Sequence, residues 1–254
     1  MTTLIRAELL KLRTSRGTLG LATALLALVC FVVLLHGFAL PKDFAVHGRV
    51  ADGQMKVFGW GELGALFAGL LGALSITGEL RHGTIRPTFL ATPRRSRVIG
   101  AKVVAVGLAG LLFGLAAELL AIGLGAAALG LRGIPIRLDG SDYAQLLTGG
   151  VIAGALWAPL SLGLGALVRN QVATVVGLCA WLLFIESLLI GQVPGFARYL
   201  PGAAAAAIGG ATLMGDVPTH PSLLVPVAGA LLLAVWAALA VLIGIVSTVR
   251  RDVP

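Results

Sequence analysis

Long apolar segments alternate with short polar ones along the whole chain, and six of the apolar segments are long enough to cross a bilayer. A helix needs about 20 apolar residues to cross roughly 30 Å of hydrocarbon. Because lipid offers the backbone no hydrogen-bond partner, such segments cross as helices. We therefore predict an all-α, polytopic membrane bundle that forms one domain over residues 1–254. The predicted spans are residues 17–40, 58–78, 98–129, 143–168, 172–193 and 223–249.

The composition agrees with a membrane protein. Only 12% of the residues are charged, 58% are hydrophobic, and the mean hydropathy is +0.99. Soluble domains have about 25% charged and roughly 45–50% apolar residues. The chain has 35 glycines, and small residues let helices approach closely in lipid. Two small-xxx-small pairs, Gly110 with Gly114 and Gly150 with Gly154, are therefore expected to mediate packing within the chain.

The positive charges gather at one set of helix ends. If both termini are cytoplasmic, thirteen Lys and Arg residues lie in the cytoplasm and six lie outside. The opposite orientation would reverse this bias, against the positive-inside rule. We therefore predict a multi-pass protein of the bacterial cytoplasmic (inner) membrane with both termini in the cytoplasm. This placement also explains the net charge of +8, so we do not expect nucleic acid as a partner.

Residues 1–16 contain four basic residues and a single acid, Glu8. Ile5, Leu9 and Leu12 fall on one face of a helix, which is typical of an interfacial helix on the inner leaflet. A plain positive flank before the first span explains the same residues equally well. The span that follows is too long for a signal-peptide core and has no small-x-small cleavage site after it, so we expect it to be retained.

Residues 79–102, ELRHGTIRPTFLATPRRSRVIGAK, form the most distinctive polar segment. Five arginines and a lysine accompany one glutamate there, and such charge holds a loop in the cytoplasm. Residues 84–92 fit a short helix, with Pro87 in its first turn and Pro93 ending it. We predict that residues 79–97 form a cytoplasmic loop through which a partner outside the bilayer moves the neighbouring helices.

The other connections are shorter or less regular. Residues 41–57 and 132–142 have mixed charge, which is typical of outer loops. Residues 169–171 predict a tight inner turn, and Pro159 predicts a kink in the fourth span. Residues 194–222 are apolar but interrupted, which indicates short outward-facing or re-entrant helices before the last span.

Catalytic and nucleotide-binding patterns are missing from the sequence. There is no GxxxxGK[ST] loop, so we do not expect this chain to hydrolyse nucleotides by that route. There is no HExxH pattern, and His36 is the only histidine within a span, near its outer end. An intramembrane serine protease would need a histidine in mid-membrane. Cys30 and Cys179 lie inside apolar segments, so we expect no disulfide framework and no metal site. With none of these patterns present, we expect no catalytic residue.

Three glutamates within or near the spans are candidates for a translocation path, because ionisable groups in a bilayer are costly and commonly functional. Glu62 lies near the outer end of the second span, where a solvated helix end is the simpler explanation. Glu118 lies midway along the third span and Glu186 lies deep in the fifth. For both, a structural hydrogen bond to a neighbouring helix is the alternative.

The loop and the topology together resemble a known family. The chain is similar to type-2 ABC transporter permeases, the six-helix membrane subunits of ABC exporters. The resemblance covers nearly the whole length, from the basic N-terminal stretch IRAELLKLRTSRG to the broken apolar stretch before the last span. Its most specific part is an E…R-x-G-T…P-x-x-x-R…K pattern. The residues that carry this pattern are Glu79, Arg81, Gly83, Thr84, Pro93, Arg97 and Lys102.

The resemblance implies that two permeases, identical or related, associate with two copies of a separate ABC ATPase on the cytoplasmic face. ATP and Mg²⁺ would be used by that ATPase, and this chain would bind no cofactor. The loop helix would dock on the ATPase as a coupling helix, with Phe89 and Leu90 as its apolar anchor. The arginines would pair with acidic groups or lipid phosphates, although topology and membrane lipids alone also explain them.

The expected function is therefore outward transport of an amphipathic, drug-like, peptide or lipid-like substrate, with no enzymatic activity in this chain. The apolar character of every span favours such a cargo over a highly charged one. Two alternatives stay open: a membrane-embedded enzyme acting on lipids, and a non-transporting membrane sensor or assembly component.

Overall fold

The computed structural model describes residues 1–39, 41, 50–84, 87, 90, 94–209 and 223–250. Every regular element of these residues is helical. Six helical segments are long and apolar enough to cross a membrane, which confirms the prediction of an all-α, multi-pass membrane protein. These segments are Arg16–Ala39, Gly53–Arg81, Ser96–Leu131, Gly140–Val168, Gln171–Gln192 and Pro226–Thr248.

The helices follow one another with short connections. The first half of the chain forms α1 (Thr2–Thr14), α2 (Arg16–Ala39), α3 (Val50–Phe58), the 3₁₀ turn η1 (Gly59–Glu62), α4 (Leu63–Arg81) and α6 (Arg95–Leu131). The second half forms α7 (Gly140–Val168), α8 (Gln171–Ala180), the π-helical turn η2 (Trp181–Ile185), α9 (Glu186–Gln192), α10 (Pro194–Ala197), α11 (Pro201–Gly209) and α12 (Pro226–Arg250).

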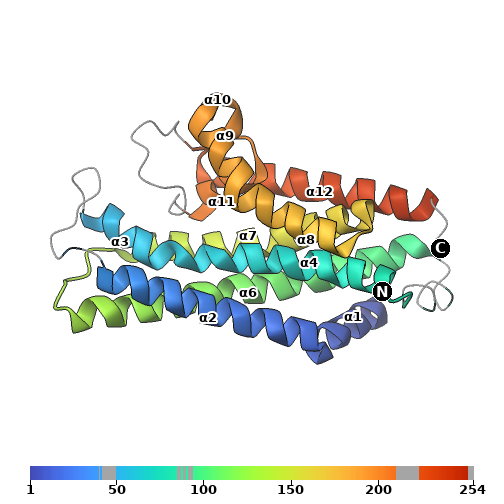
Figure 1. The fold of residues 1–254 in the computed structure, drawn as a ribbon, viewed down its shortest axis with the longest axis horizontal. Coiled ribbons are helices and arrows are strands. Elements are labelled where there is room, and N and C mark those ends of the chain that lie inside the picture. The colour runs from blue at the N-terminus through green and yellow to red at the C-terminus, as the bar shows by residue number, and fades with distance from the viewer. Residues whose placement is uncertain are drawn as a thin grey trace.

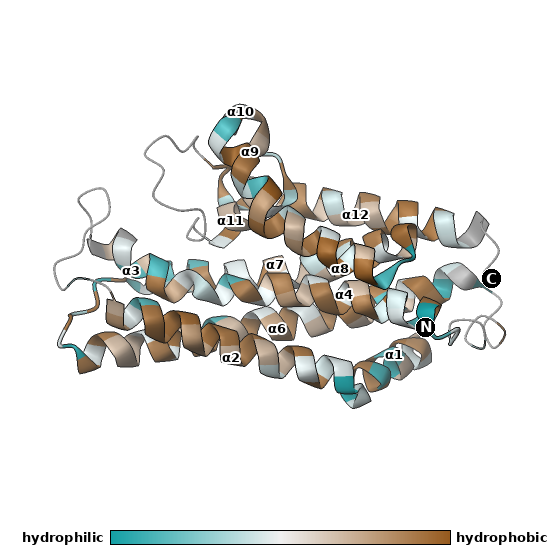
Figure 2. Ribbon diagram, viewed as in Figure 1, coloured by the Kyte–Doolittle hydropathy of each residue, from teal (hydrophilic) through white to brown (hydrophobic). Residues whose placement is uncertain are grey.

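The long helices lie side by side, and α7 is at the centre of their packing (Figure 1). It contacts α4, α6 and α12, and its buried Trp157, Ala158 and Leu162 enter two of the hydrophobic clusters. Few residues of the outer helices α2 and α12 are buried, as in lipid-facing helices. Figure 2 shows brown residues over these helices and teal residues mainly towards the ends of the bundle, in α1 and α3. We call these two ends the α1 end and the α3 end.

The predicted outer loop 41–57 is wrong in its second half. Val50–Phe58 is the helix α3, which runs through η1 into α4, so the second span begins earlier than residue 58. Val57 and Phe58 are fully buried, whereas Asp52, Gln54 and Lys56 lower the mean hydropathy of this segment, so hydropathy alone does not predict the helix. The buried side chain of Gln54 donates to the carbonyl of Pro135 at 2.8 Å, which ties α3 to the loop after α6.

The turn between α7 and α8 is as tight as predicted. Arg169 has a left-handed φ of 57° and donates its N–H to the Gly165 carbonyl at 2.9 Å, which ends α7. Asn170 then caps α8, since its side chain accepts from the N–H of Ala173 at 3.0 Å.

Two short helices, α10 and α11, occupy the described part of residues 194–222, in agreement with the interrupted apolar pattern. Almost all of α11 is buried, and it packs against α7 and α12. Protein therefore covers its backbone, which is the condition for such a short segment within an apolar environment. Its re-entry into a bilayer stays a prediction.

The glycine pairs of α6 and α7 bring the two backbones into contact. A Cβ at Gly110 would collide with the carbonyl of Gly154, and a Cβ at Gly114 would collide with that of Gly150. Each small-xxx-small pair therefore faces the other, and no larger residue fits at these positions. Close packing within the chain is the role we expected for them.

Gly114→Ala tests this contact. Because the added methyl group would collide with the Gly150 carbonyl, we expect a loss of stability on the order of 1–3 kcal/mol and a lower thermal midpoint in detergent. Gly123→Ala on the same helix is the matched control, since a Cβ there meets no atom within 4 Å. Equal midpoints for the two variants would show that the helices do not approach this closely.

Candidate functional site

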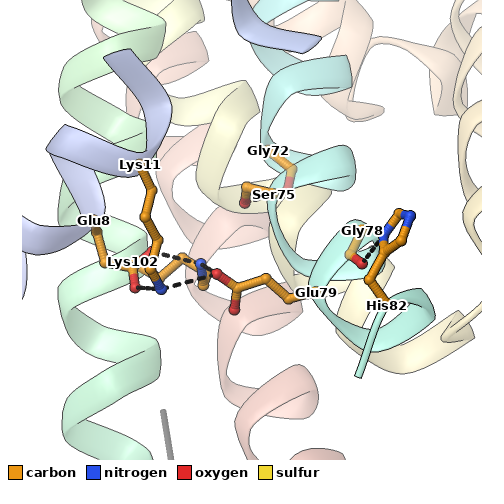
Figure 3. Close-up of polar contacts among 8 residues, drawn as sticks. All are labelled: Glu8, Lys11, Gly72, Ser75, Gly78, Glu79, His82 and Lys102. Atoms are coloured by element: carbon orange, nitrogen blue, oxygen red, sulfur yellow. Dashed lines mark hydrogen bonds and ion pairs between the residues drawn. The ribbon is translucent and has the colours of Figure 1, made fainter. Parts of the chain in front are cut away.

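Four charged residues from three helices meet at the α1 end of the bundle (Figure 3). Glu8 and Lys11 come from α1, Glu79 from the end of α4, and Lys102 from the beginning of α6. We call these four residues the charged junction. Lys102 Nζ lies 2.5 Å from Glu8 Oε2 and 3.0 Å from Glu79 Oε1. Lys11 Nζ lies 2.7 Å from Glu8 Oε1 and 3.0 Å from Glu79 Oε1.

Lys102 is the buried centre of the junction. Its side chain is 3% exposed, whereas that of Lys11 is 46% exposed. Each carboxylate contacts both ammonium groups, so two negative and two positive charges balance. A buried charge that loses its partner costs several kcal/mol, so each member of the junction depends on the others. The N-terminal helix is thereby fixed to the two helices that flank the polar segment 79–102.

The junction favours the charged forms of its members. Burial opposes ionisation of Glu8, but the ammonium groups of Lys102 and Lys11 outweigh it, so the pKa of Glu8 lies below its ordinary value of 4.5. Burial also opposes the charged form of Lys11. The hydrogen bond to Glu8 and the charge of Glu79 outweigh it, and the pKa of Lys11 lies above 10.5. Both groups are therefore charged across the neutral range.

Glu79 and Lys102, the first and last residues of the predicted coupling pattern, thus come together although 23 positions separate them. The structure adds Glu8 and Lys11, which the sequence placed only in a basic flank or interfacial helix. Their spacing of three residues, which puts them on one helical face, was the available signal. Neither their partners nor the burial of Lys102 follows from that spacing.

The other described residues of the coupling pattern lie outside the junction. Arg81 Nη1 lies 3.4 Å from Gln171 Oε1 and links α4 to α8. Gly83 has a φ of 68°, a conformation that side chains disfavour, in the turn after α4. Thr84 and Arg97 are exposed.

The predicted coupling helix at residues 84–92 falls mostly outside the described residues, as do Phe89 and Pro93. Leu90 is described, and 85% of its surface is exposed. An apolar side chain this exposed is a candidate for contact with lipid or a partner.

Glu186 is fully buried near the α3 end and has hydrogen-bond partners. Its carboxylate accepts from Trp181 Nε1 at 2.8 Å and from the N–H of Ala203 at 2.7 Å. Ala203 lies in the first turn of α11, where amide groups lack partners within the helix and a negative charge is favourable. Glu186 therefore makes a structural hydrogen bond of the kind that we gave as the alternative, and this bond holds α11 against the π-helical turn η2. A part for Glu186 in a translocation path stays a prediction.

Glu118 is equally buried, but neither of its carboxyl oxygens has a hydrogen-bond partner among the described residues. The carboxyl group lies between Gly61 of η1 and Gly150 of α7. A Cβ at either glycine would overlap with it. Two close-packed glycines therefore make the space for this carboxyl group inside the bundle.

A cavity of about 250 Å³ lies between η1, α4, α7, η2, α9 and α11, and Glu118 is not among its lining residues. Its wall is mostly apolar, and Glu62 is the one acidic residue among the described residues that line it. Of the three predicted path glutamates, Glu62 lines this cavity, whereas Glu118 lies against Gly61, the residue that precedes Glu62. Glu186 lies at another part of the wall, behind Gly202. The remaining polar or aromatic lining residues are Trp60, Trp157 and Ser187.

Comparison of the chain with models of known protein families and with curated proteins finds no match.

Acidification tests the charged junction. Because the pKa of Glu8 is lowered in the folded protein, its contribution to stability is present above about pH 4.5 and is lost as the pH falls through the lower folded value. We expect the thermal midpoint to fall more steeply in this range for the unmodified protein than for Glu8→Gln, which has no carboxylate to protonate. Thermal unfolding in detergent, from neutral pH to about pH 3, measures the midpoints of the two proteins. If the two midpoints fell in parallel as the pH is lowered, this result would contradict an ionised, paired Glu8.

Proposed function

We propose that this chain is the membrane-spanning permease subunit of an ATP-driven ABC exporter in a bacterial cytoplasmic membrane, with both termini in the cytoplasm. It moves an amphipathic, drug-like, peptide or lipid-like substrate outward. A separate ABC ATPase, present in two copies, binds and hydrolyses ATP with Mg²⁺. A second copy of the chain or a related permease completes the membrane part.

The observation that carries the proposal is the charged junction. The polar segment 79–102 resembles the coupling segment of type-2 permeases, and its two ends are Glu79 and Lys102. These residues pair with each other and with α1, so the ends of the segment are fixed to three helices at once. A rigid attachment of this kind is what a loop needs if it is to transmit a displacement into a membrane bundle.

The loop itself supplies the docking chemistry in this proposal. Its arginines pair with acidic groups of the ATPase, and Phe89 with Leu90 enters an apolar groove. Leu90 is 85% exposed in the chain alone, which supports a covered position in a complex. ATP changes the orientation of the permease only if the ATPase binds two permease conformations with different affinity. The junction makes α4, α6 and α1 respond together to that difference.

Leu90→Asp tests docking on the ATPase. A charge at this position would have to enter the apolar groove, so we expect the ABC ATPase to be lost or reduced at least tenfold in affinity purifications of the chain from its native membrane in mild detergent. Phe89→Asp, tested in parallel, should act in the same way. Mass spectrometry of the eluate identifies and quantifies the ATPase.

Leu131→Asp is the matched control, because Leu131 is another leucine on the surface, 81% exposed, at the α3 end of α6. It should retain the ATPase. Recovery of an ABC ATPase with the unmodified chain and with Leu131→Asp, but not with Leu90→Asp, supports the proposal. Absence of any ABC ATPase from the unmodified chain would favour a membrane enzyme or a sensor instead.

A further inference from the structure

The cavity between η1, α4, α7, η2, α9 and α11 has an apolar interior. Its buried lining residues are small or apolar: Leu63, Ala65, Gly149, Ala153, Trp157, Ala206 and Gly209. Among their side chains, only that of Trp157 carries a polar atom. No lysine, arginine or histidine is among the described residues that line the cavity, so its wall provides no positive charge for an anionic group. The interior therefore suits an uncharged, apolar group.

The polar lining residues do not change this chemistry. Ser187 is exposed and Glu62 is partly exposed, so neither belongs to the buried interior. Glu62 also has an interaction partner within the chain, so its charge does not have to be compensated by a ligand.

Water is a poor occupant of this space. A buried water molecule needs roughly two to four polar partners, and the buried part of the wall has few polar side-chain atoms. Apolar cavities of about 150 Å³ stay dry and take up a molecule such as benzene. The cavity here has about 250 Å³. An apolar group can thus fill it without leaving its own polar atoms unpaired.

The cavity opens on the apolar surface of the fifth span. Leu183 and Ser187 both line it and are both exposed. Next to them, Phe184 is 70% exposed and Leu188 is 64% exposed. Exposed apolar side chains on a membrane span are a surface for contact with lipid or with another span. In a bilayer, acyl chains are therefore the apolar groups that surround the mouth of the cavity.

Two walls of the cavity are held together by buried hydrogen bonds. The carboxylate of Glu186 accepts from Trp181 Nε1 in η2 and from the N–H of Ala203 in α11. Leu182 follows Trp181 and Gly202 precedes Ala203, and both of these neighbours line the cavity. The turn η2 is π-helical, and π-helical turns are frequent at functional sites. The cavity is thus a fixed part of the fold.

We propose that this cavity binds one acyl chain of a membrane phospholipid, which enters past Leu183 and ends against Ala153 and Trp157. The volume of about 250 Å³ admits part of a chain and not a whole lipid. The charged headgroup stays outside, because no cation among the described lining residues would bind its phosphate. As a statement about transport, this inference rests on the proposed function, and it selects the lipid-like class among the proposed substrates.

The test labels the interior of the cavity from the lipid. The purified full chain is placed in nanodiscs of phosphatidylglycerol that carries a diazirine at the end of one acyl chain. After illumination, mass spectrometry locates the adducts on single residues. We expect adducts on Ala153 or Trp157 at a level at least tenfold above that of Leu129, a fully buried residue that does not line the cavity.

Leu112 on α6 is 61% exposed and shows that the probe reacts with residues that face lipid. Labelling of Leu112 without labelling of Ala153 and Trp157 would overturn the proposal. A second copy of the chain seated over the mouth would give this result. A single-chain alcohol with the same diazirine, added to nanodiscs of ordinary lipid, tests the other source of a hydrocarbon chain. Labelling of the two wall residues by the alcohol alone would contradict a phospholipid chain.

Substitutions place the effect in the cavity. Ala205→Phe puts a ring into the wall and should lower the labelling of Ala153 and Trp157 at least fivefold. Ser187→Phe narrows the mouth at an exposed position, so it serves even if Ala205→Phe fails to fold. Ala238→Phe is the matched control, because Ala238 is an exposed residue of α12 outside the cavity, and it should leave the labelling unchanged. Undiminished labelling in a folded Ala205→Phe and in Ser187→Phe would contradict entry through this cavity.

This experiment uses the chain without an ATPase. Its failure therefore leaves the result of the Leu90→Asp purification untouched, and loss of the ATPase leaves the labelling untouched. The two proposals can thus fail separately.

Discussion

The arrangement of this bundle depends on four charges that are held together at one end of a largely apolar molecule. Lys102 is almost completely buried, and its ammonium group is compensated only by Glu8 and Glu79 within the junction. Since an uncompensated buried charge is costly, α1 has to remain where Glu8 reaches Lys102. The N-terminal helix is therefore part of the bundle and not merely a flank that sets orientation. In the proposed transporter, this attachment makes the ends of α4 and α6 move with α1.

Glycine packing plays the corresponding role within the apolar part. Contacts between Gly110 and Gly154 and between Gly114 and Gly150 bring α6 and α7 together without side chains between them. The same closeness presses the carboxyl group of Glu118 against Gly150, where no described group donates a hydrogen bond to it. Tight packing and an unsatisfied buried acid are thus two results of one interface. Because an ionisable group inside a membrane bundle is costly, Glu118 stays a candidate for a functional role.

Hydropathy predicts the six long helices because lipid-spanning segments must be long and apolar. The glycine spacing predicts close packing within the chain, but not that α6 and α7 are the helices that meet. Hydropathy does not predict the helix α3 because Asp52, Gln54 and Lys56 make the segment polar, although Val57 and Phe58 are buried. Glu8 and Lys102 are 94 positions apart, and nothing in a single sequence indicates that two residues so far apart form a pair. Glu186 has hydrogen-bond partners and Glu118 has none among the described residues, and this difference likewise depends on which groups the fold brings near each carboxyl group. Only the rule that buried acids are functional candidates was available beforehand.

A double-mutant cycle on Glu8 and Lys102 tests most directly whether the junction holds the three helices together. The free energy of unfolding would be measured by SDS titration for Glu8→Gln, Lys102→Met and the combined variant, with Arg97→Met as an exposed control on α6. We predict a coupling energy of about 1–3 kcal/mol, with the combined variant less destabilised than the sum of the two single variants, and little change for Arg97→Met. Strictly additive effects of Glu8→Gln and Lys102→Met would contradict the account.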